Sequence, residues 1–439
     1  MRVPAEAESS DSPDCEEIYL SQKAVSRFGR ELREAHFNFA PSYTPLNHGS
    51  FGSFPSSVRD HQRGLQDAIE SRPDTFIRFT YPKLLQQART AISPLLGAAV
   101  DEVVFLPNVT TAINVILRNL SYQEGDVILY FSTIYPSCLK TIQSLEETTP
   151  VASHCIELTY PVEDCAIIDK FRAAIDQFSQ PKSSRVKLAL FDTVLTFPGV
   201  RFPWESLVRV CREQGVLSCI DGAHGIGHID LTYLAREGPD FFGFLPEDQR
   251  RRLSTKEYFV QLFNKIATTD TTPYLCIVEA LKFRNEICGG ESQVRDYCIH
   301  LARDGGDRMA AMLGTNVLEN LTRTLRNCCF ANVRLPLEIE QGTVPPWSPS
   351  QVEKNMGKVP VEEANAVADW ITKKSVEEFD TFIATRYYAG AFWVRISSQI
   401  YLQREDFEWA AAVLLELCGR VKAGCWKEDG DTQGPDMRP

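Results

Sequence analysis

Apolar and polar positions alternate along the chain with two different periods, which predict helices and strands in turn. Apolar residues recur at helical spacing near 56–71 and 82–96, from Thr110, from Pro136, near 166–178 and over Pro203–Gln214. Short apolar runs typical of buried strands lie between them, at Glu102–Leu106, Val127–Phe131, near 152–157, Val186–Phe191 and Val216–Ile220. Strands that alternate with amphipathic helices form βαβ units, so the chain is predicted to be an α/β protein with a mostly parallel sheet.

The regular alternation weakens from about residue 290, which indicates a division into units. We expect an N-terminal arm over residues 21–60, a large α/β domain over 61–290 and a smaller α+β domain over 291–426. Residues 1–20 and 427–439 are polar and rich in proline, glycine or acidic side chains, so both ends are predicted to be disordered.

Composition and charge narrow the class of protein. The 439 residues are 44% hydrophobic and 24% charged, which is typical of a globular protein. A net charge of −12 disfavours nucleic acid and anionic lipid as partners, so small molecules or proteins are expected. No apolar run is long enough to span a bilayer, and the first residues lack the pattern of a signal or transit peptide. The 13 cysteines show no Cys-x-x-Cys spacing, which favours free thiols and a cytoplasmic location.

Polar residues gather in the turns that follow three predicted strands. Ligands of parallel sheets bind at the carboxyl ends of the strands, so these turns are where a site is expected. Thr110 and Thr111 open a helix whose N–H groups and dipole suit a phosphate, although an ordinary N-cap also explains them. Tyr135 stands just past another strand, where it could lie over a planar cofactor or serve as a packing aromatic.

The third turn contains Asp221, His224 and His228. A carboxylate at the end of a buried strand is unfavourable unless a positive group meets it, and a protonated pyridine nitrogen would serve. His224 could then reach a phenolic oxygen of the same ring. A metal site at His224 and His228 is a weak alternative, and no zinc-protease, hydrolase or P-loop motif occurs, so no metal is predicted.

These turns, together with the segments Leu46–Gly52 and Trp393–Tyr401, resemble the class V aminotransferase family of pyridoxal-phosphate enzymes. The resemblance covers most of the chain and points to the branch that contains isopenicillin N epimerase and hercynylcysteine sulfoxide lyase. It implies the aspartate-aminotransferase-like fold, with a large, mostly parallel sheet domain and a smaller α+β domain. It also implies pyridoxal 5'-phosphate as the cofactor.

The resemblance further implies a role for individual cofactor residues. Thr110 and Thr111 would hold the phosphate and Tyr135 would stack on the ring. Asp221 would pair with the pyridine nitrogen, while His224 and Thr196 would support the ring oxygen; Asp221 and His224 are the predicted catalytic residues.

Other residues are implied to bind the substrate or the neighbouring subunit. Arg395 would bind the substrate α-carboxylate, which its fixed fork suits, although a structural ion pair is the alternative. Asn47, His48 and Gly49 would form a loop on the substrate side. Thr268 would reach the phosphate of the neighbouring subunit, which predicts a homodimer.

The chain departs from the family at the lysine that holds the cofactor as an imine. The segment Pro239–Phe242 matches the residues that precede that lysine, but Gly243–Arg252 resembles a later part of the family, so the lysine segment is predicted to be missing. We favour an incorrectly spliced gene model or isoform, because the other cofactor positions are intact. The alternatives are an inactive pseudoenzyme and a relocated lysine, Lys256 or Lys265, and no lysine is assigned as catalytic. Loss of the segment should remove sheet strands and uncover apolar surface.

The function implied by the resemblance is that of a lyase acting at Cα or Cβ of an amino-acid-like substrate, by C–S or C–C cleavage, in thiol-histidine or secondary metabolism. Epimerase and aminotransferase activities are alternatives, because all of them use one electron sink. A catalytically inactive dimerising or regulatory protein is the alternative from another class. Cys138 and Cys276 could carry persulfide chemistry, although we expect a buried structural thiol at each.

Overall fold

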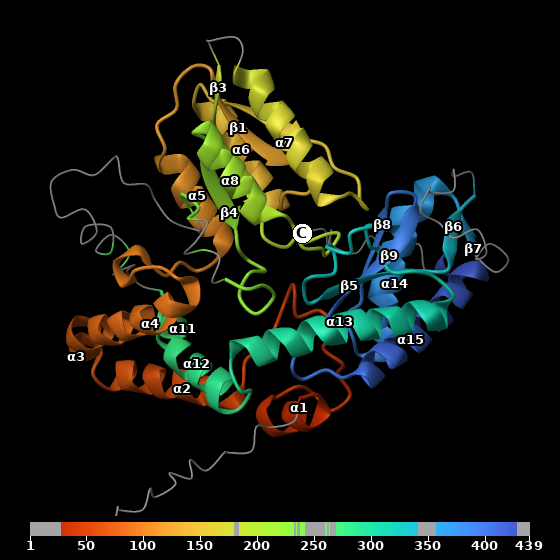
Figure 1. The fold of residues 1–439 in the computed structure, drawn as a ribbon. Helices are drawn as coiled ribbons and strands as arrows, with labels where there is room; N and C mark the ends of the chain where they lie inside the picture. The colour runs from red at the N-terminus through yellow and green to blue at the C-terminus, as the bar shows by residue number, and fades with distance from the viewer. Residues whose placement is uncertain are drawn as a thin grey trace, which may run out of the picture.

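A four-stranded parallel sheet lies at the centre of the larger part of the molecule (Figure 1). The computed structural model describes residues 28–179, 184–231, 234, 238–241, 260, 263, 269–340 and 357–427. The strand order is β2-β1-β3-β4, and the strands are β1 (Asp126–Phe131), β2 (Ala152–Ile156), β3 (Arg185–Asp192) and β4 (Leu217–Asp221). The predicted parallel α/β sheet is therefore confirmed.

Helices cover both faces of this sheet, which explains why its strands read as nearly continuous apolar runs. One face packs against α5 (Val109–Asn119) and α6 (Pro136–Thr148). The other face packs against α7 (Asp164–Ser179) and α8 (Trp204–Gln214). Because all four strands are parallel, their carboxyl ends meet at one edge, and the polar turns of the sequence lie there.

The strand predicted at Glu102–Leu106 is wrong. Val100–Glu102 forms a short 3-10 helix, η2, and residues 103–106 form no strand. Beyond β4, the described sheet continues only through Phe241, which pairs with Cys219 in a single parallel bridge. An apolar run becomes a strand only when another strand offers hydrogen bonds, and no such partner for residues 103–106 lies in the part of the chain that the structure describes.

A second unit follows, built on an antiparallel sheet of order β5-β9-β8. Helices α13 and α15 pack against each other, and α13 contacts β5 while α14 contacts β8. Its elements are α13 (Glu291–Leu313), β5 (Phe330–Arg334), β6 (Leu337–Ile339), β7 (Gly357–Val359), η4 (Val361–Glu363), α14 (Ala364–Phe379), β8 (Ala384–Tyr388), β9 (Ala391–Ser397), α15 (Arg404–Lys422) and η5 (Cys425–Lys427).

A separate group of helices packs around its own small core of apolar side chains, which includes Leu65, Phe76, Leu85 and Leu275. In Figure 1 this group lies below the parallel sheet and beside the start of α13. Its elements are α2 (Ser56–Ser71), α3 (Pro73–Thr75), the π-helix η1 (Phe76–Thr80), α4 (Tyr81–Leu96), α11 (Thr272–Leu275) and α12 (Ile277–Glu286).

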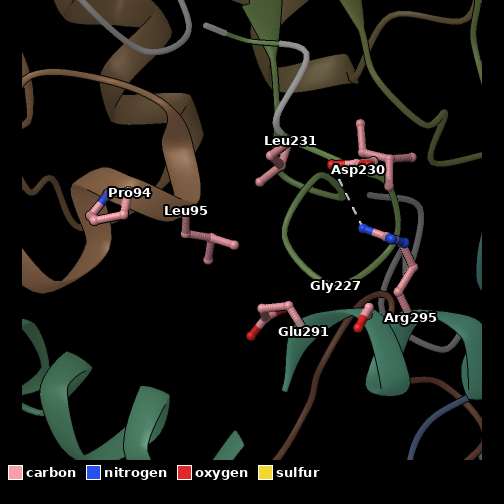
Figure 2. A pocket seen from close by; sticks show the side chains of 9 residues that line it. Pro94, Leu95, Gly227, Asp230, Leu231, Glu291 and Arg295 are labelled. Carbon is pink, nitrogen blue, oxygen red and sulfur yellow. Dashed lines mark ion pairs between the residues drawn. The ribbon is translucent and has the colours of Figure 1, made fainter. Parts of the chain in front are cut away.

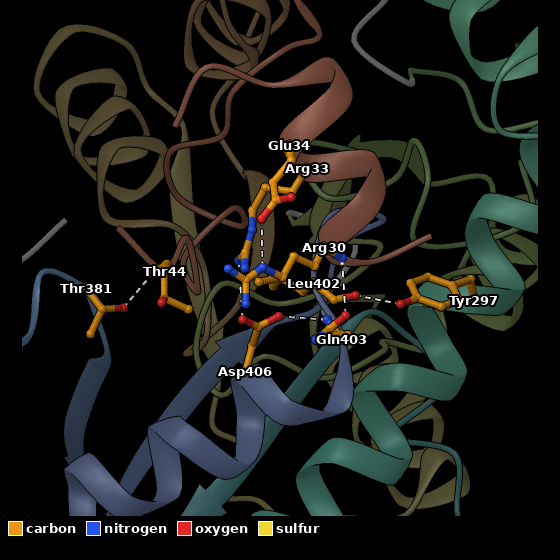
Figure 3. A network of polar contacts seen from close by, with 9 residues as sticks. All are labelled: Arg30, Arg33, Glu34, Thr44, Tyr297, Thr381, Leu402, Gln403 and Asp406. Carbon is orange, nitrogen blue, oxygen red and sulfur yellow. Dashed lines mark hydrogen bonds and ion pairs between the residues drawn. The ribbon is translucent and has the colours of Figure 1, made fainter. Parts of the chain in front are cut away.

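The first described residues pack against the last third of the chain (Figure 3). In α1 (Arg30–His36), Arg33 forms an ion pair of 3.3 Å with Asp406 at the start of α15. The hydroxyl of Thr381 donates a 2.7 Å hydrogen bond to the carbonyl of Thr44. The segment that precedes residue 47 is therefore fixed to the second unit. The domain boundaries themselves remain predictions.

The predicted disordered ends fall almost wholly outside the described residues. Residues 1–20 and 428–439 lie outside them, whereas Lys427 belongs to η5. In the described part of the chain, no helix combines the length and the apolar character that a membrane span needs.

Candidate active site

Asp221 lies at the carboxyl end of β4 and is buried, with 7% of its surface exposed. Its Oδ1 accepts a 3.0 Å hydrogen bond from the backbone N–H of Ala223, and its Oδ2 lies 3.7 Å from the Cys138 thiol in the first turn of α6. Burial raises the pKa of the Asp221 carboxyl, while the two hydrogen bonds act in the opposite direction. No lysine, arginine or histidine pairs with Asp221 among the described residues, so the carboxylate can receive a cationic group.

His224 follows three residues later and packs edge-on against the ring of Phe330, with ring centroids 5.2 Å apart. Its Nε2 lies 3.4 Å from the hydroxyl oxygen of Thr196. Burial, together with the positive charge of Arg395, lowers the pKa of His224 to about 4, so the ring is neutral at pH 7. The predicted proximity of His224 and Thr196 is thus present in the structure.

Arg395 projects from β9 into the same region and is buried, with 3% exposed. Its Nη1 donates a 2.7 Å hydrogen bond to the carbonyl of Thr196, and its Nη2 donates to Asn47 Oδ1 at 2.9 Å and Ser50 Oγ at 2.7 Å. All three acceptors are neutral, and the buried Nε has no hydrogen-bond partner. Burial lowers the pKa of Arg395 to about 10, with a smaller effect from Arg386.

The buried positive charge of Arg395 therefore requires a negatively charged partner. A buried guanidinium is unfavourable unless a negative group compensates it. No ion pair joins Arg395 to a carboxylate in the described ranges. The alternative of a structural ion pair thus gains no support from the described contacts, and an anionic ligand is the natural partner.

The loop that contains Asn47, His48 and Gly49 lies against Arg395. His48 Nδ1 is 2.7 Å from the hydroxyl of Tyr401, a buried residue just after β9. Gly49 donates a 3.1 Å backbone hydrogen bond to Ser397, and a Cβ on Gly49 would lie 2.4 Å from the Phe330 ring, so only glycine fits. Burial and the positive charge of Arg284 lower the pKa of His48 to about 4.

Phe330 and Asn332 of β5 connect the two units at this site. The Asn332 side chain forms two hydrogen bonds with the backbone of Gly199, of 3.0 Å to its N–H and 2.7 Å to its carbonyl. A Cβ on Gly199 would lie 2.8 Å from both Arg395 and Phe330. Phe330 also lies under the Arg395 guanidinium, 4.9 Å from it. The loop that carries Thr196 is therefore held tightly against β5 and β9.

Thr110 and Thr111 begin α5, which packs against α6 and β4. Asn108 caps this helix, because its Oδ1 accepts hydrogen bonds from the backbone and hydroxyl of Thr111 at 2.8 and 2.9 Å. Tyr135 is the residue immediately before α6, one turn ahead of Cys138. All of these positions lie at the carboxyl edge of the sheet, on the side of Asp221 that faces α5 and α6.

Several sequence predictions lie outside this group. Thr268, Lys256 and Lys265 are outside the described residues, as is the segment that follows Phe241. His224 and His228 have ring centroids 5.9 Å apart, but no cluster of three metal-binding side chains exists in the described ranges. Burial raises the pKa of the thiols of Cys138 and Cys276, the latter to about 11, which suits structural thiols.

A neighbouring cavity of about 240 Å³ lies between the end of α4 and the start of α13 (Figure 2). Leu95 lines one side, while Asp230 and Arg295 line the other and form an ion pair of 3.8 Å. Gly227 is the lining residue closest in sequence to His224 and His228. The cavity borders the turn that carries the histidines but contains none of the predicted site residues.

The described residues fit pyridoxal phosphate. Asp221 offers a buried carboxylate with no described cationic partner, and Arg395 offers a buried cation with an unpartnered Nε. Thr133, two residues before Tyr135, also has a buried hydroxyl without a partner. Unpaired buried polar groups are unfavourable in an empty protein, and a polar ligand with both charges would satisfy them.

Sequence reasoning missed four residues of this site. Ser50, Phe330 and Tyr401 contact Arg395 or His48 directly, and Asp192 lies beside Asp221. Ser50 and Tyr401 lie within or at the end of segments that had been singled out, so their polar side chains were a usable signal. Asp192 also ends an apolar strand, which is the feature that identified Asp221.

Comparison with known proteins gives a consistent result. The profile of the family described as Aminotransferase class-V matches residues 77–244. An L-cysteine desulfhydrase-like protein of Epichloe uncinata, lolT1, is 33% identical, covering 90% of this chain and 96% of its own. The hercynylcysteine sulfoxide lyase of Schizosaccharomyces pombe is 25% identical, covering 89% of this chain and 98% of its own.

Solved structures share the fold. The cystine C–S lyase C-DES, in complex with its product cysteine persulfide, has a TM-score of 0.63 at 15% identity and covers 85% of this chain and 97% of its own. The sequence alignment with lolT1 spans 444 positions, more than the 439 residues of this chain, although only 90% of the chain is aligned. Several dozen aligned positions are therefore occupied in the relative alone.

Proposed function

This chain belongs to the class V aminotransferase family, and on that premise we propose that it is a pyridoxal-phosphate-dependent carbon–sulfur lyase for a cysteine-like amino acid. The observation that carries the proposal is the match over 90% of the chain to an L-cysteine desulfhydrase-like protein. The hercynylcysteine sulfoxide lyase of Schizosaccharomyces pombe supports the same class of reaction.

The site residues have roles that follow from their surroundings. Pyridoxal phosphate, when bound, supplies an electron sink for the electrons of a bond broken at Cα. Asp221 would hold the ring nitrogen in its protonated form, since a buried carboxylate favours a cation beside it. The neutral His224 and the hydroxyl of Thr196 can hydrogen-bond the ring oxygen. Thr110 and Thr111 would hold the phosphate at the start of α5, and Tyr135 would cover the ring.

Arg395 is the proposed anchor for the substrate. Its guanidinium is fixed by Thr196, Asn47 and Ser50, so the remaining hydrogen-bonding capacity can bind a carboxylate without reorganisation. His48 lies beside this anchor and is held by Tyr401. Burial around Phe330 excludes water from the bound carboxylate, which strengthens the interaction.

The lysine that would hold the cofactor as an imine is not among the described residues of the site. No described lysine is a partner of Asp221, His224 or Arg395, and Lys256 and Lys265 lie outside the described ranges. We propose that the native product contains an additional segment after Phe242. The aligned positions occupied only in the relative support this, as does the run 103–106, which has no strand partner among the described residues and would gain one.

The test is an assay of the full-length product with L-cysteine and with a cysteine-conjugate sulfoxide. A lyase should release sulfide or the conjugated sulfur fragment, together with pyruvate and ammonia in equal amounts. Sustained racemisation or transamination without pyruvate would instead support the epimerase or aminotransferase that shares these residues.

A catalytically inactive protein is the second candidate, and the predicted absence of the lysine favours it. It predicts that the chain of this sequence binds pyridoxal phosphate without forming an imine. Borohydride reduction followed by peptide mapping tests this, since a cofactor fixed stoichiometrically to one mapped lysine of this chain excludes the inactive form.

We also propose a cytoplasmic homodimer, with a role in thiol-histidine or secondary metabolism. The apolar side chains of Phe51 and Phe79 are 87% and 65% exposed, which favours a protein contact. The cysteines in the described ranges are free thiols, as expected in a reducing compartment. Light scattering on the wild type and F79D would test the dimer, because a buried charge should weaken it.

A further inference from the structure

Two carboxyl groups lie side by side at the carboxyl edge of the parallel sheet. Asp192 ends β3 and Asp221 ends β4, and the two residues are register partners on adjacent parallel strands. Register partners point to the same face of a sheet, and neighbouring strands are about 4.8 Å apart. Both side chains are buried, with 6% and 7% exposed. A backbone hydrogen bond of 3.1 Å from Thr193 to Asp221 holds the two strand ends together.

The surroundings of the pair contain no positive charge in the described part of the molecule. Cys138 of α6, Cys219 of β4 and Tyr160, which follows β2, are the other titratable groups that interact with the pair. Burial raises the pKa of both carboxyls, and the charge of Asp221 raises that of Asp192 further. Asp221 accepts a hydrogen bond from Ala223, which favours its ionised form. Asp221 is therefore the member that carries the charge, and Asp192 the member that keeps a proton.

We propose that Asp192 is a positioning residue for Asp221: the two form an acid pair that holds one proton on Asp192, and the pair gives up this proton when a ring nitrogen lies against Asp221. The inference rests on the proposed function, since that nitrogen belongs to pyridoxal phosphate. A neutral ring nitrogen against Asp221 would gain one N–H bond while Asp192 would lose its O–H proton, by way of Asp221, so the total charge of the site would be unchanged. The doubly negative pair then holds the protonated form of the ring more strongly than Asp221 alone.

The first test uses the full chain without cofactor. Unfolding by urea is measured from pH 4.5 to 8.5 for the wild type, D192N, D221N and the double variant. Because both pKa values are raised in the folded state, the pair stabilises the protein at acid pH, and this contribution is lost as the pH rises. D192N should therefore gain stability relative to the wild type with increasing pH.

The double variant provides the control for coupling. At the acid end of this range the effects of the single substitutions should come closest to adding, because protonation weakens the repulsion between the carboxyls. As the pH rises and Asp192 loses its proton, each single substitution removes the same repulsion, so the double variant should gain less than the sum, by about tenfold in the folding equilibrium constant. Two outcomes would show that the two carboxyls do not form an acid pair. One is additivity at every pH, and the other is a pH dependence of unfolding free energy in D192N that runs parallel to that of the wild type. D192S is measured in parallel in case the asparagine does not fold.

The second test measures binding at pH 8 of pyridoxal phosphate and of its analogue with carbon in place of the ring nitrogen. The wild type should prefer the cofactor, and D192N should lose about tenfold of that preference, as expected for a change of about one pKa unit at the ring nitrogen. An equal loss for both ligands would indicate a merely structural role and overturn the inference. If the wild type binds neither ligand, the proposed function fails, while the pH-dependent coupling still decides whether the acid pair exists.

Discussion

Arg395 Nη2 donates a hydrogen bond of 2.9 Å to Oδ1 of Asn47, a residue 348 positions earlier in the chain. The other terminal nitrogen donates to the carbonyl of Thr196, in the middle of the chain. Two distant segments, residues 47–50 and Thr196, thus fix one guanidinium, and both contribute neutral acceptors. This arrangement leaves the positive charge uncompensated by any described carboxylate, so an anionic ligand is the expected partner.

Arg395→Lys should weaken the binding of an amino-acid substrate by about 100-fold, because a charged hydrogen bond contributes about 1.5–3 kcal/mol and lysine cannot reproduce the fork. Calorimetric titration of the full-length product measures this. Arg334→Lys is the matched control, since Arg334 is also buried, with 2% exposed, but lies at the end of β5 rather than on β9. A similar loss in both variants would contradict the role of Arg395.

The stability contributed by His48 and His224 should fall as the pH decreases from about 6.5 to about 4. The pKa values of His48 and His224 are lowered to about 4 in the folded state, so the unfolded chain takes up protons first in this window. Each ring should contribute up to about 1.4 kcal/mol per pH unit. Urea unfolding of H48Q and H224Q should show a shallower decline than the wild type, whereas H61Q, at an exposed position, should keep the wild-type slope.

Tyr401→Phe removes the 2.7 Å hydrogen bond to His48 and should free its ring to reorient. We expect a loss of about 1 kcal/mol in unfolding free energy, together with a changed pH midpoint for the His48 ring in NMR spectra. Tyr297→Phe is the control, because it removes a comparable hydrogen bond of 2.6 Å to the carbonyl of Leu402, which involves no histidine. The hypothesis fails if Y401F changes stability alone, as Y297F should.

Thr110→Val should weaken pyridoxal phosphate binding by about tenfold, the effect of losing a hydrogen bond to a charged group. Binding of pyridoxal, which lacks the phosphate, should not change. Absorbance titration of both ligands against both proteins gives the comparison. If the two ligands weaken equally, the start of α5 does not hold the phosphate.

The native protein should be heavier than the 49.5 kDa of this sequence. An intact-mass measurement and peptide map should reveal a lysine-bearing peptide after Phe242. The physical reason is the apolar run 103–106, which lacks a described strand partner. A native mass equal to that of this sequence would make the inactive form the leading candidate.

The sequence predicted much of the fold because most of its signals are local. The run Val186–Phe191 is buried on both faces, so its apolar composition identified β3 correctly. The run Glu102–Leu106 has a similar composition but is not a strand, because pairing depends on a partner that local composition cannot report.

The site residues also divide into those with a local sequence signal and those whose contacts depend on distant parts of the chain. Asp221 and His224 were identified from one turn, because a charged residue after a buried strand is visible in the sequence. Tyr401 and Phe330 were missed, since their contacts with His48 and Arg395 arise from packing of β5 and β9 against distant loops. The pairing of Asp192 with Asp221 required the register of two strands.

The attachment of α1 to α15 has a consequence for the protein during its synthesis. Arg33 and Thr44 leave the ribosome long before their partners Asp406 and Thr381 have been translated. The beginning of the chain therefore stays unattached until these partners are made. The parallel sheet, which lies between the two regions in the sequence, can already assemble from nearby segments. We expect ribosome-bound chains that stop before Thr381 to hold a formed sheet and a protease-sensitive start.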